Sequence, residues 1–169
     1  MLQEISIDSI ELDPFATIGK DTMLITATSA KGWNTMTASW GGMGHLWNRD
    51  VMFIFVRKSR YTHSFLEEGS RFTCSFFPEE QKRALGYLGS HSGRDGDKVK
   101  ASGLNVEALD DGGISFKEAN LVFACTKIAE SEMSPENFHL PEDIVRDVYR
   151  DGDWHTKSTC SAEQALLFA

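Results

Sequence analysis

The sequence predicts a β-rich α+β domain, in which a sheet is accompanied by short helices. Several segments are rich in β-branched and aromatic residues, short helical patterns lie between them, and no internal repeat or low-complexity linker interrupts the chain. The 169 residues, of which 41% are hydrophobic, fit one domain spanning 1–169 with a sizeable core. Because closing a sheet into a small barrel removes its exposed edges, we expect a barrel.

The first part of the chain is expected to supply a hairpin and a buried strand. Residues 22–30 read TMLITATSA, the dipeptide Lys31-Gly32 can turn the chain, and NTMTASW follows. The glycines within 41–47 are expected to loosen the chain into a loop. The uninterrupted apolar run VMFIFV at 51–56 predicts a strand that is buried on both faces.

Short helices and strands are expected to alternate from residue 61 onward. Caps and periodicity define the boundaries, with Ser59 or Thr62 as the N-cap of the first helix. The expected elements are a helix at 61–68, a half-buried strand at 71–77, a helix from Pro78 through Leu88 with Gly89 as its C-cap, a loop at 90–98, one bent strand or two strands within 114–128, and a helix at 142–149.

Composition and charge exclude several classes of protein. The net charge of −8 would repel a phosphate backbone, so nucleic acid is not expected as a partner and any anion site must be local. No signal peptide and no run of roughly 18 apolar residues is present, which predicts a cytoplasmic protein that does not enter a membrane. Cys74, Cys125 and Cys160 are odd in number and widely spaced, which suits reduced thiols. No Cys/His cluster indicates a metal site, and no GxSxG motif indicates a serine hydrolase.

The stretch NTMTASW carries an unusual row of hydroxyls. Alternation along an extended chain places Thr35, Thr37 and Ser39 on one face. The opposite face then carries Asn34, Met36, Ala38 and Trp40. The hydroxyls either point into water or hydrogen-bond a ligand, and the pattern leaves both readings open.

A basic cluster follows the predicted strand at 51–56. Arg57, Lys58 and Arg60, with the hydroxyls of Ser59 and Thr62, lie where a strand ends and a helix begins. Unpaired N–H groups at a helix N-terminus and adjacent arginines can bind a phosphate. The alternative is that these residues merely keep the end of an apolar strand in water.

Two further features are weaker. The tract SHSGRDGDK at 90–98 has small residues that allow close backbone approach, and Lys98 could reach an anion, but the spacing is not that of a P-loop or a calcium loop. A surface loop is the alternative. His155, in DGDWH, has no catalytic partner nearby in the sequence and could equally be a structural histidine.

Five stretches together resemble the flavin reductase-like family of FMN-binding split barrels, and most closely its flavoredoxin-like members. They are NTMTASWGGMGHLW, FVRKSRYTHSFLEEG, FTCSFF, ALGYLGSHSGRDGDKVKASGL and YRDGDWH, in the same order and with similar spacing. The resemblance implies a Greek-key split barrel with short peripheral helices, and a homodimer that binds one FMN per subunit at or near the interface. The family has an apolar strand after this histidine, whereas TKSTCSAEQALLFA is polar and then briefly aliphatic, so the sequence leaves this last strand open.

The resemblance also implies the residues that bind the cofactor. They are Asn34, Thr35, Met36, Thr37, Ala38, Ser39 and Trp40 along the isoalloxazine and ribityl groups, Arg57, Ser59, Arg60, Tyr61 and Thr62 at the ribityl and phosphate groups, Ser92, Gly93 and Lys98 in a loop over the cofactor, and His155 near it.

The function expected from this resemblance is electron transfer from NADH or NADPH through FMN to a flavin, a metal complex or a protein. No catalytic side chain is expected, because the cofactor supplies the chemistry and the protein positions and tunes it. One alternative is an FMN-binding electron carrier without a nicotinamide site of its own. The glycine-rich surround, Gly41, Gly42, Gly44 and Gly93, favours the enzyme because it could admit a second planar ligand. Another alternative is a barrel that has lost its cofactor.

Overall fold

Ten strands and five short α-helices make up the computed structural model, which describes residues 2–168. The strands are β1 Leu2–Ile5, β2 Met23–Ser29, β3 Gly32–Ala38, β4 Gly41–Leu46, β5 Arg49–Arg57, β6 Arg71–Phe76, β7 Val106–Ala108, β8 Ile114–Phe116, β9 Leu121–Glu132 and β10 His155–Phe168. The helices are α1 Pro14–Gly19, α2 Tyr61–Glu68, α3 Lys82–Ser90, α4 Lys98–Ser102 and α5 Glu142–Val148, with single 3-10 turns at Ile7–Ser9, Glu79–Gln81 and Pro135–Asn137.

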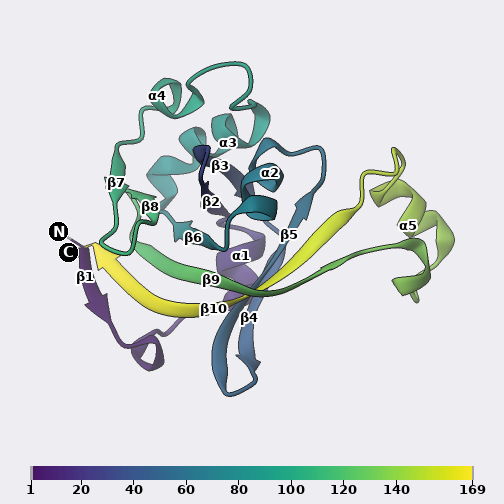
Figure 1. The fold of residues 1–169 in the computed structure, drawn as a ribbon, viewed down its shortest axis with the longest axis horizontal. Coiled ribbons are helices and arrows are strands. Elements are labelled where there is room, and N and C mark those ends of the chain that lie inside the picture. The colour runs from purple at the N-terminus through teal and green to yellow at the C-terminus, as the bar shows by residue number, and fades with distance from the viewer. Residues whose placement is uncertain (1, 169) are drawn as a thin grey trace.

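One antiparallel sheet organises the fold. Its strand order is β3-β2-β6-β9-β10-β5-β4, and β1 pairs with the far end of β10. The long strands β9 and β10 curve strongly across the molecule, and α2, α3 and α4 gather at one end of it (Figure 1). Strands β7 and β8 form a separate small hairpin. The expectation of a β-rich fold with a few short helices is confirmed.

Two apolar clusters lie on opposite faces of β2, because neighbouring side chains on a strand point to opposite sides. Ile25 packs in one cluster, with Phe72 and Phe123 among its members. Leu24 packs in the other cluster, which includes Leu88 from α3. Each such buried side chain contributes about 1.5 to 3 kcal/mol relative to exposure. The second cluster fixes α3 against the sheet beside β3.

Strand β6 is confirmed, but the prediction that it is half-buried was wrong. Residues 72–76 are all buried, since one face packs in the first cluster and Thr73 and Ser75 on the other face hydrogen-bond with β8. Strand β5 was expected to be buried on both faces, and this prediction was wrong, because Phe53 and Phe55 are only half-buried.

The loop predicted at 41–47 was wrong, because most of this segment forms β4, which pairs with β5. A Cβ atom at Gly41 would lie 2.7 Å from the carbonyl oxygen of Phe53, so glycine permits this close approach. Trp47 and Asn48 have positive φ angles of 51° and 56°, which turn the chain between the two strands.

The polar C-terminal segment forms β10, a strand that the sequence did not predict. Residues His155–Ser161 pair with β5, β9 accompanies the strand from Thr156 to Leu167, and its end pairs with β1. Ladder hydrogen bonds to strands on both sides satisfy its backbone, so the segment needs no continuous apolar pattern. Ser158, Thr159 and Ser161 are buried in it.

Helices α2 and α5 confirm the predictions at 61–68 and 142–149, while other boundaries differ. Arg60, rather than Ser59 or Thr62, stands at the N-cap of α2. Helix α3 continues through Gly89, where an added Cβ would lie 3.1 Å from Cβ of Thr37, so this glycine is a packing position and not a cap. The predictions missed β1, α1, α4 and β7.

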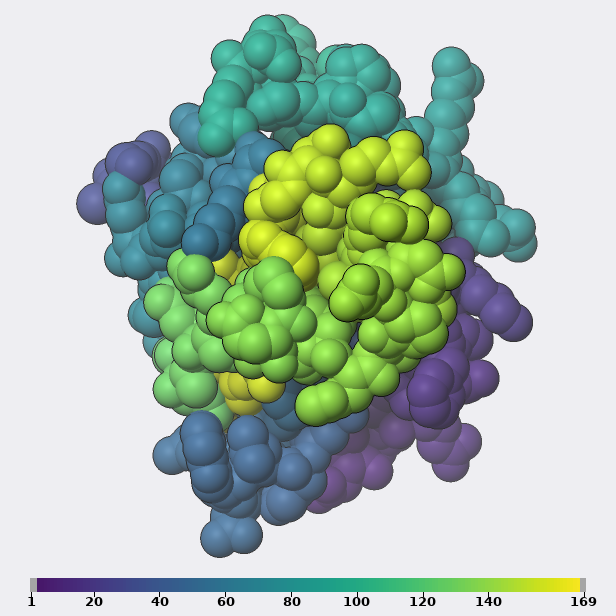
Figure 2. Space-filling view, turned by 90° about the vertical axis from the view of Figure 1, so that its right-hand side faces the viewer, coloured from purple at the N-terminus to yellow at the C-terminus, as the bar shows by residue number. Residues whose placement is uncertain are grey.

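The segment 133–154 connects β9 to β10 and carries α5. It stands out from the sheet in Figure 1 and covers the centre of the face shown in Figure 2. Within residues 2–168, no helix has the length and apolar character needed to span a bilayer. The three cysteines are free and buried.

Candidate functional site

Two adjoining cavities contain most of the residues that the sequence singled out. The ring cavity, of about 260 Å³, is lined by Met36, Thr37, Ala38, Ser39, Trp40, Phe55, Arg57, Arg60 and His155. The anion cavity, of about 180 Å³, is lined by Asn34, Met36, Ser59, Arg60, Tyr61, Thr62, Leu88, Ser90, His91, Ser92, Gly93, Arg94 and Lys98. Met36 and Arg60 line both cavities, which are therefore neighbours.

The hydroxyl row of β3, which consists of Thr35, Thr37 and Ser39, does not face these cavities with all three of its members. The Thr35 hydroxyl accepts a hydrogen bond from Thr26 at 2.9 Å and donates to the Ile25 carbonyl at 3.3 Å, and Thr35 lines neither cavity. Thr37 Oγ1 donates to the carbonyl of Leu85 in α3 at 2.5 Å. Two of the three hydroxyls therefore join β3 to its neighbours.

Asn34 on the opposite face of β3 organises the anion cavity. Its Nδ2 donates to Thr62 Oγ1 at 2.7 Å, which joins β3 to the first turn of α2. A Cβ atom at Gly93 would collide with Asn34 Oδ1, so a larger residue would have to displace this hydrogen-bonded amide for the loop at 90–98 to approach as closely. Strand, helix and loop thus meet at one amide side chain.

Three cations and no carboxylate line the anion cavity. Arg60 donates to the Gly89 carbonyl at 3.2 Å, and Arg94 donates to the Ser59 carbonyl at 3.1 Å while lying over the Tyr61 ring. The first residues of α2 add the partial positive charge of a helix N-terminus. In a chain of net charge −8, this concentration of positive charge is local.

Lys98, the third cation, is held below the surface. Only 7% of the residue is exposed, and Nζ donates to the carbonyls of Leu88 and His91 at 2.9 Å each. Burial, and secondarily the charge of Arg60, lower the pKa of Lys98 to about 8. A bound anion would favour the protonated amine.

Arg57 and Ser59 are engaged by the α5 segment rather than free for a phosphate. Arg57 donates to the carbonyls of Val148 and Asp153 at 2.7 and 3.3 Å. The Ser59 backbone N–H and hydroxyl donate to the Asp153 carboxylate at 3.1 and 2.5 Å. Burial opposes ionisation of Asp153, but these Ser59 bonds and the Arg57 charge together lower its pKa. Arg57 lines the ring cavity alone, so the cations of the anion cavity are Arg60, Arg94 and Lys98.

His155 lies at the wall of the ring cavity and is 4% exposed. Its Nδ1 is 2.9 Å from the Tyr149 hydroxyl, and its ring centroid is 5.1 Å from that of Trp40. Burial is the main cause that lowers the pKa of His155 to about 4, and Arg57 and Arg60 add to it against the opposing charge of Asp153. The imidazole is therefore neutral at pH 7.

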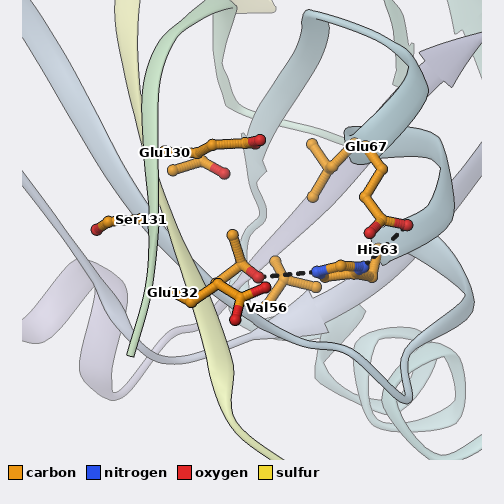
Figure 3. Close-up of a pocket in the computed structure, with 9 residues that line it drawn as sticks. Val56, His63, Glu67, Glu130, Ser131 and Glu132 are labelled. Carbon is orange, nitrogen blue, oxygen red and sulfur yellow. Dashed lines mark hydrogen bonds and ion pairs between the residues drawn. The ribbon is translucent and has the colours of Figure 1, made fainter. Parts of the chain in front are cut away.

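A third cavity, here called the acidic cavity, lies on another side of α2 and has a volume of about 160 Å³ (Figure 3). His63 and Glu67 of α2 lie on one side of it, and Glu130 and Glu132 of β9 lie opposite. His63 Nε2 is 2.9 Å from Thr156 Oγ1. Among the described residues, no group of three or more His, Cys, Asp or Glu side chains could hold a metal ion.

An apolar cavity of about 420 Å³ adjoins the ring cavity. It is lined by Pro14, Phe15, Ile18, Gly19, Ser39, Trp40, Gly41, Gly42, Met43 and Phe55. Ser39, Trp40 and Phe55 line both cavities. Helix α1, which the sequence did not predict, forms one wall, so a flat apolar molecule could lie next to a ligand of the ring cavity.

Sequence reasoning did not select several residues at or next to these cavities. Arg94 lines the anion cavity and lies inside the glycine-rich tract that was examined, so its charge could have drawn attention to it. Phe55 lines the ring cavity and belongs to a strand that was expected to be wholly buried. Tyr149 and Asp153 contact His155 and Ser59. Both lie in the stretch YRDGDWH, but their contacts depend on how the α5 segment returns to β5.

Comparisons with known proteins give the family of this chain. Residues 15–140 match the Flavin reductase like domain, and the chain belongs to this family. No curated protein sequence matches the chain.

Solved structures of the same fold are FMN-binding, flavoredoxin and flavin oxidoreductase proteins. An FMN-binding domain of a flavin reductases-like enzyme from Shewanella baltica is 16% identical, with a TM-score of 0.70 over 99% of this chain and 77% of that one. Flavoredoxin from Methanosarcina acetivorans is 18% identical, with a TM-score of 0.67 over 96% and 74%. An NADH:FAD oxidoreductase from Streptomyces globisporus, in complex with NAD and FAD fragments, is 16% identical, with a TM-score of 0.65 over 86% and 73%.

Proposed function

We propose that this protein is an FMN-binding oxidoreductase that takes electrons from NADH or NADPH and passes them to a flavin, a metal complex or a protein. The observation that carries the proposal is an anion cavity with three cations and no carboxylate, next to a cavity walled by Trp40 and Phe55. FMN combines a phosphate dianion with a flat ring system. The family to which the chain belongs supports the same cofactor.

Particular residues would hold each part of FMN. Arg60, Arg94 and Lys98 would bind the phosphate, with the N-terminus of α2 behind it. Asn34, Tyr61, Thr62, Ser92 and Gly93 would surround the phosphate and ribityl groups. Met36 to Trp40, with Arg57 and His155, would surround the isoalloxazine ring. When bound, FMN would supply the electron-transfer chemistry, while the protein orients it and tunes its electrostatics.

The apolar cavity supports the enzyme over a simple electron carrier. It opens beside the ring cavity along Ser39, Trp40 and Phe55, which leaves room for a nicotinamide ring next to the flavin. The similarity to an NADH:FAD oxidoreductase favours the same reading. The similarity to flavoredoxin favours the second candidate, an FMN carrier that has no nicotinamide site of its own.

We also propose that the curved sheet is a Greek-key split barrel, that residues 1–169 form one domain, and that two copies assemble as a homodimer. Phe15 and Trp40, which line the apolar cavity, are 88 and 49% exposed, and large exposed apolar side chains there favour an interface near the ring cavity. Light scattering coupled to size-exclusion chromatography tests the dimer, and a mass of one chain would contradict it.

An anaerobic titration tests the proposed function. The purified chain, saturated with FMN, is mixed with NADH and separately with NADPH while the flavin absorbance is followed. Bleaching within seconds to minutes is expected for the oxidoreductase. FMN binding without bleaching would leave the electron carrier, and failure to bind FMN would contradict both candidates and leave a barrel without its cofactor.

A further inference from the structure

The hydrogen bond between Tyr149 and His155 has no evident part in binding a phosphate. The two polar atoms are 2.9 Å apart, and both side chains are buried. Tyr149 directly follows α5, and His155 begins β10, so this contact ties the α5 segment to the wall of the ring cavity. Both residues lie outside the 15–140 segment that matches the family.

Chemistry decides which partner donates. A phenol is a better proton donor than a neutral imidazole N–H, and the unprotonated imidazole nitrogen is the better acceptor. The other neighbour of the Tyr149 hydroxyl is Met133 Sδ at 3.8 Å, and a thioether accepts only weakly. Donation from Tyr149 to Nδ1 of His155 is therefore the more favourable arrangement.

We propose that Tyr149 is a positioning residue, which holds neutral His155 as the Nε2–H tautomer so that the imidazole offers one N–H donor to a ligand in the ring cavity. With Nδ1 bonded to Tyr149, Nε2 is the remaining polar atom of a ring that lines this cavity. The inference rests on the proposed function in that the recipient is an acceptor atom of the flavin ring. A fixed donor there would stabilise negative charge that develops on that ring.

The aromatic surroundings fix Tyr149 in place. Its ring stacks on Trp154 with centroids 4.3 Å apart and packs against Phe138 at 5.5 Å. The guanidinium of Arg57 lies 5.5 Å from the centroid of the same ring. Two rings and a cation thus restrict Tyr149, so its hydroxyl stays aimed at His155.

The charged groups around His155 keep its ring neutral. Arg57 faces it from β5, Arg60 from the start of α2, and Asp153 from the α5 segment. Two cations outweigh one carboxylate, and burial disfavours the imidazolium further. A neutral imidazole carries one proton, and its hydrogen-bond partner selects the nitrogen that holds it.

Nitrogen NMR of the purified full chain, labelled with ¹⁵N at histidine, tests the proposal without relying on activity. The spectrum of H155Q assigns the His155 signals. At pH 7 we expect Nε2 to be protonated and Nδ1 to be unprotonated. In Y149F the hydroxyl that donates to Nδ1 is gone, so the preference of the neutral ring for the Nε2–H tautomer should fall about three- to tenfold.

The matched control is W154F, which reduces the packing around Tyr149 but keeps its hydroxyl, and which should change the tautomer ratio of His155 less than twofold. Protonation at Nδ1 in the wild type, or a tautomer ratio that stays unchanged in Y149F, would overturn the proposal. The expected tautomer in a chain that does not bind FMN would refute only the cofactor, and FMN binding with the other tautomer would refute only the role of Tyr149.

Discussion

Two sites lie beside helix α2 and differ in charge. One is the anion cavity with the neighbouring ring cavity, and the other is the acidic cavity. The anion cavity and its ring cavity have Arg57, Arg60, Arg94 and Lys98 around them, with buried His155 at the wall. The acidic cavity on another side has buried His63, also within hydrogen-bond distance of a hydroxyl, but its rim is formed by glutamates. A buried histidine and a cavity of modest volume are thus common to both. The local charge is what distinguishes an anion site in this acidic chain.

The largest expected effect is the loss of FMN affinity in R60A. Arg60 lines both the ring and the anion cavity, so the substitution removes a charge-assisted contact and should weaken FMN binding by about 1.5 to 3 kcal/mol, measured by titration. K58A is the matched control, because it removes the same charge two residues away. Lys58 lines neither of these cavities and pairs with Glu132 at the acidic cavity at 2.7 Å. Equal losses in both variants would reduce the site to a nonspecific charge effect.

Acid sensitivity of folding is expected from His155. The pKa of His155 is about 4 in the folded chain against an ordinary value of 6.5, so the unfolded chain binds the proton first as pH falls below 6.5. This protonation should destabilise the fold progressively between pH 6.5 and 4, by at most about 3 kcal/mol. Urea unfolding of the wild type and H155Q at several pH values measures it. The variant should show a shallower fall in stability over this window, and parallel curves would contradict the buried neutral histidine.

Alkaline pH should weaken FMN binding through Lys98. Because burial lowers the pKa of Lys98 to about 8, the free protein loses this charge above pH 8, and FMN must then bind together with a proton. Affinity should fall by up to about tenfold for each pH unit above 8 until the amine titrates in the complex. K98M should bind FMN more weakly at pH 7 and show a flatter dependence. An unchanged pH profile in K98M would assign the effect to another group.

The smallest effect is expected at the acidic cavity. E67Q removes a carboxylate that lines this cavity and lies 3.5 Å from His63, but it leaves every residue of the ring and anion cavities in place. FMN affinity should therefore change less than about twofold, because an exposed charge beyond the binding site is screened. A loss of FMN affinity as large as that of R60A would mean that the acidic cavity, and not the anion cavity, binds the cofactor.

The sequence predicted those elements whose residues carry a recognisable local pattern. Runs of β-branched residues predicted the hairpin of β2 and β3, an apolar run predicted β5, and an N-cap pattern predicted α2. Strand β10 was not predicted, because strands on both sides satisfy its backbone and a polar sequence such as Ser158–Ser161 is tolerated there. Pairing between distant segments leaves no signature in the paired sequence itself.

In the candidate site, too, residues with a local sequence pattern could be predicted, and contacts between distant segments could not. Arg60 and Lys98 could be proposed as anion ligands from their positions next to a helix start and in a glycine-rich tract. That Asp153 would engage Ser59 could not be foreseen, since the two residues meet only when the α5 segment folds back. Thr35 was expected along the cofactor, but its hydroxyl belongs to the contact between β2 and β3, because cross-strand pairing places it opposite Thr26.

The central claim is that the anion cavity recognises a phosphate attached to a flat ring. Comparing FMN with riboflavin, which lacks only the phosphate, tests it most directly. Titration of the purified chain, freed of any bound flavin, should give an affinity for FMN at least about 100-fold higher than for riboflavin, since three cations lose their partner in riboflavin. Equal affinities for the two flavins would contradict the claim.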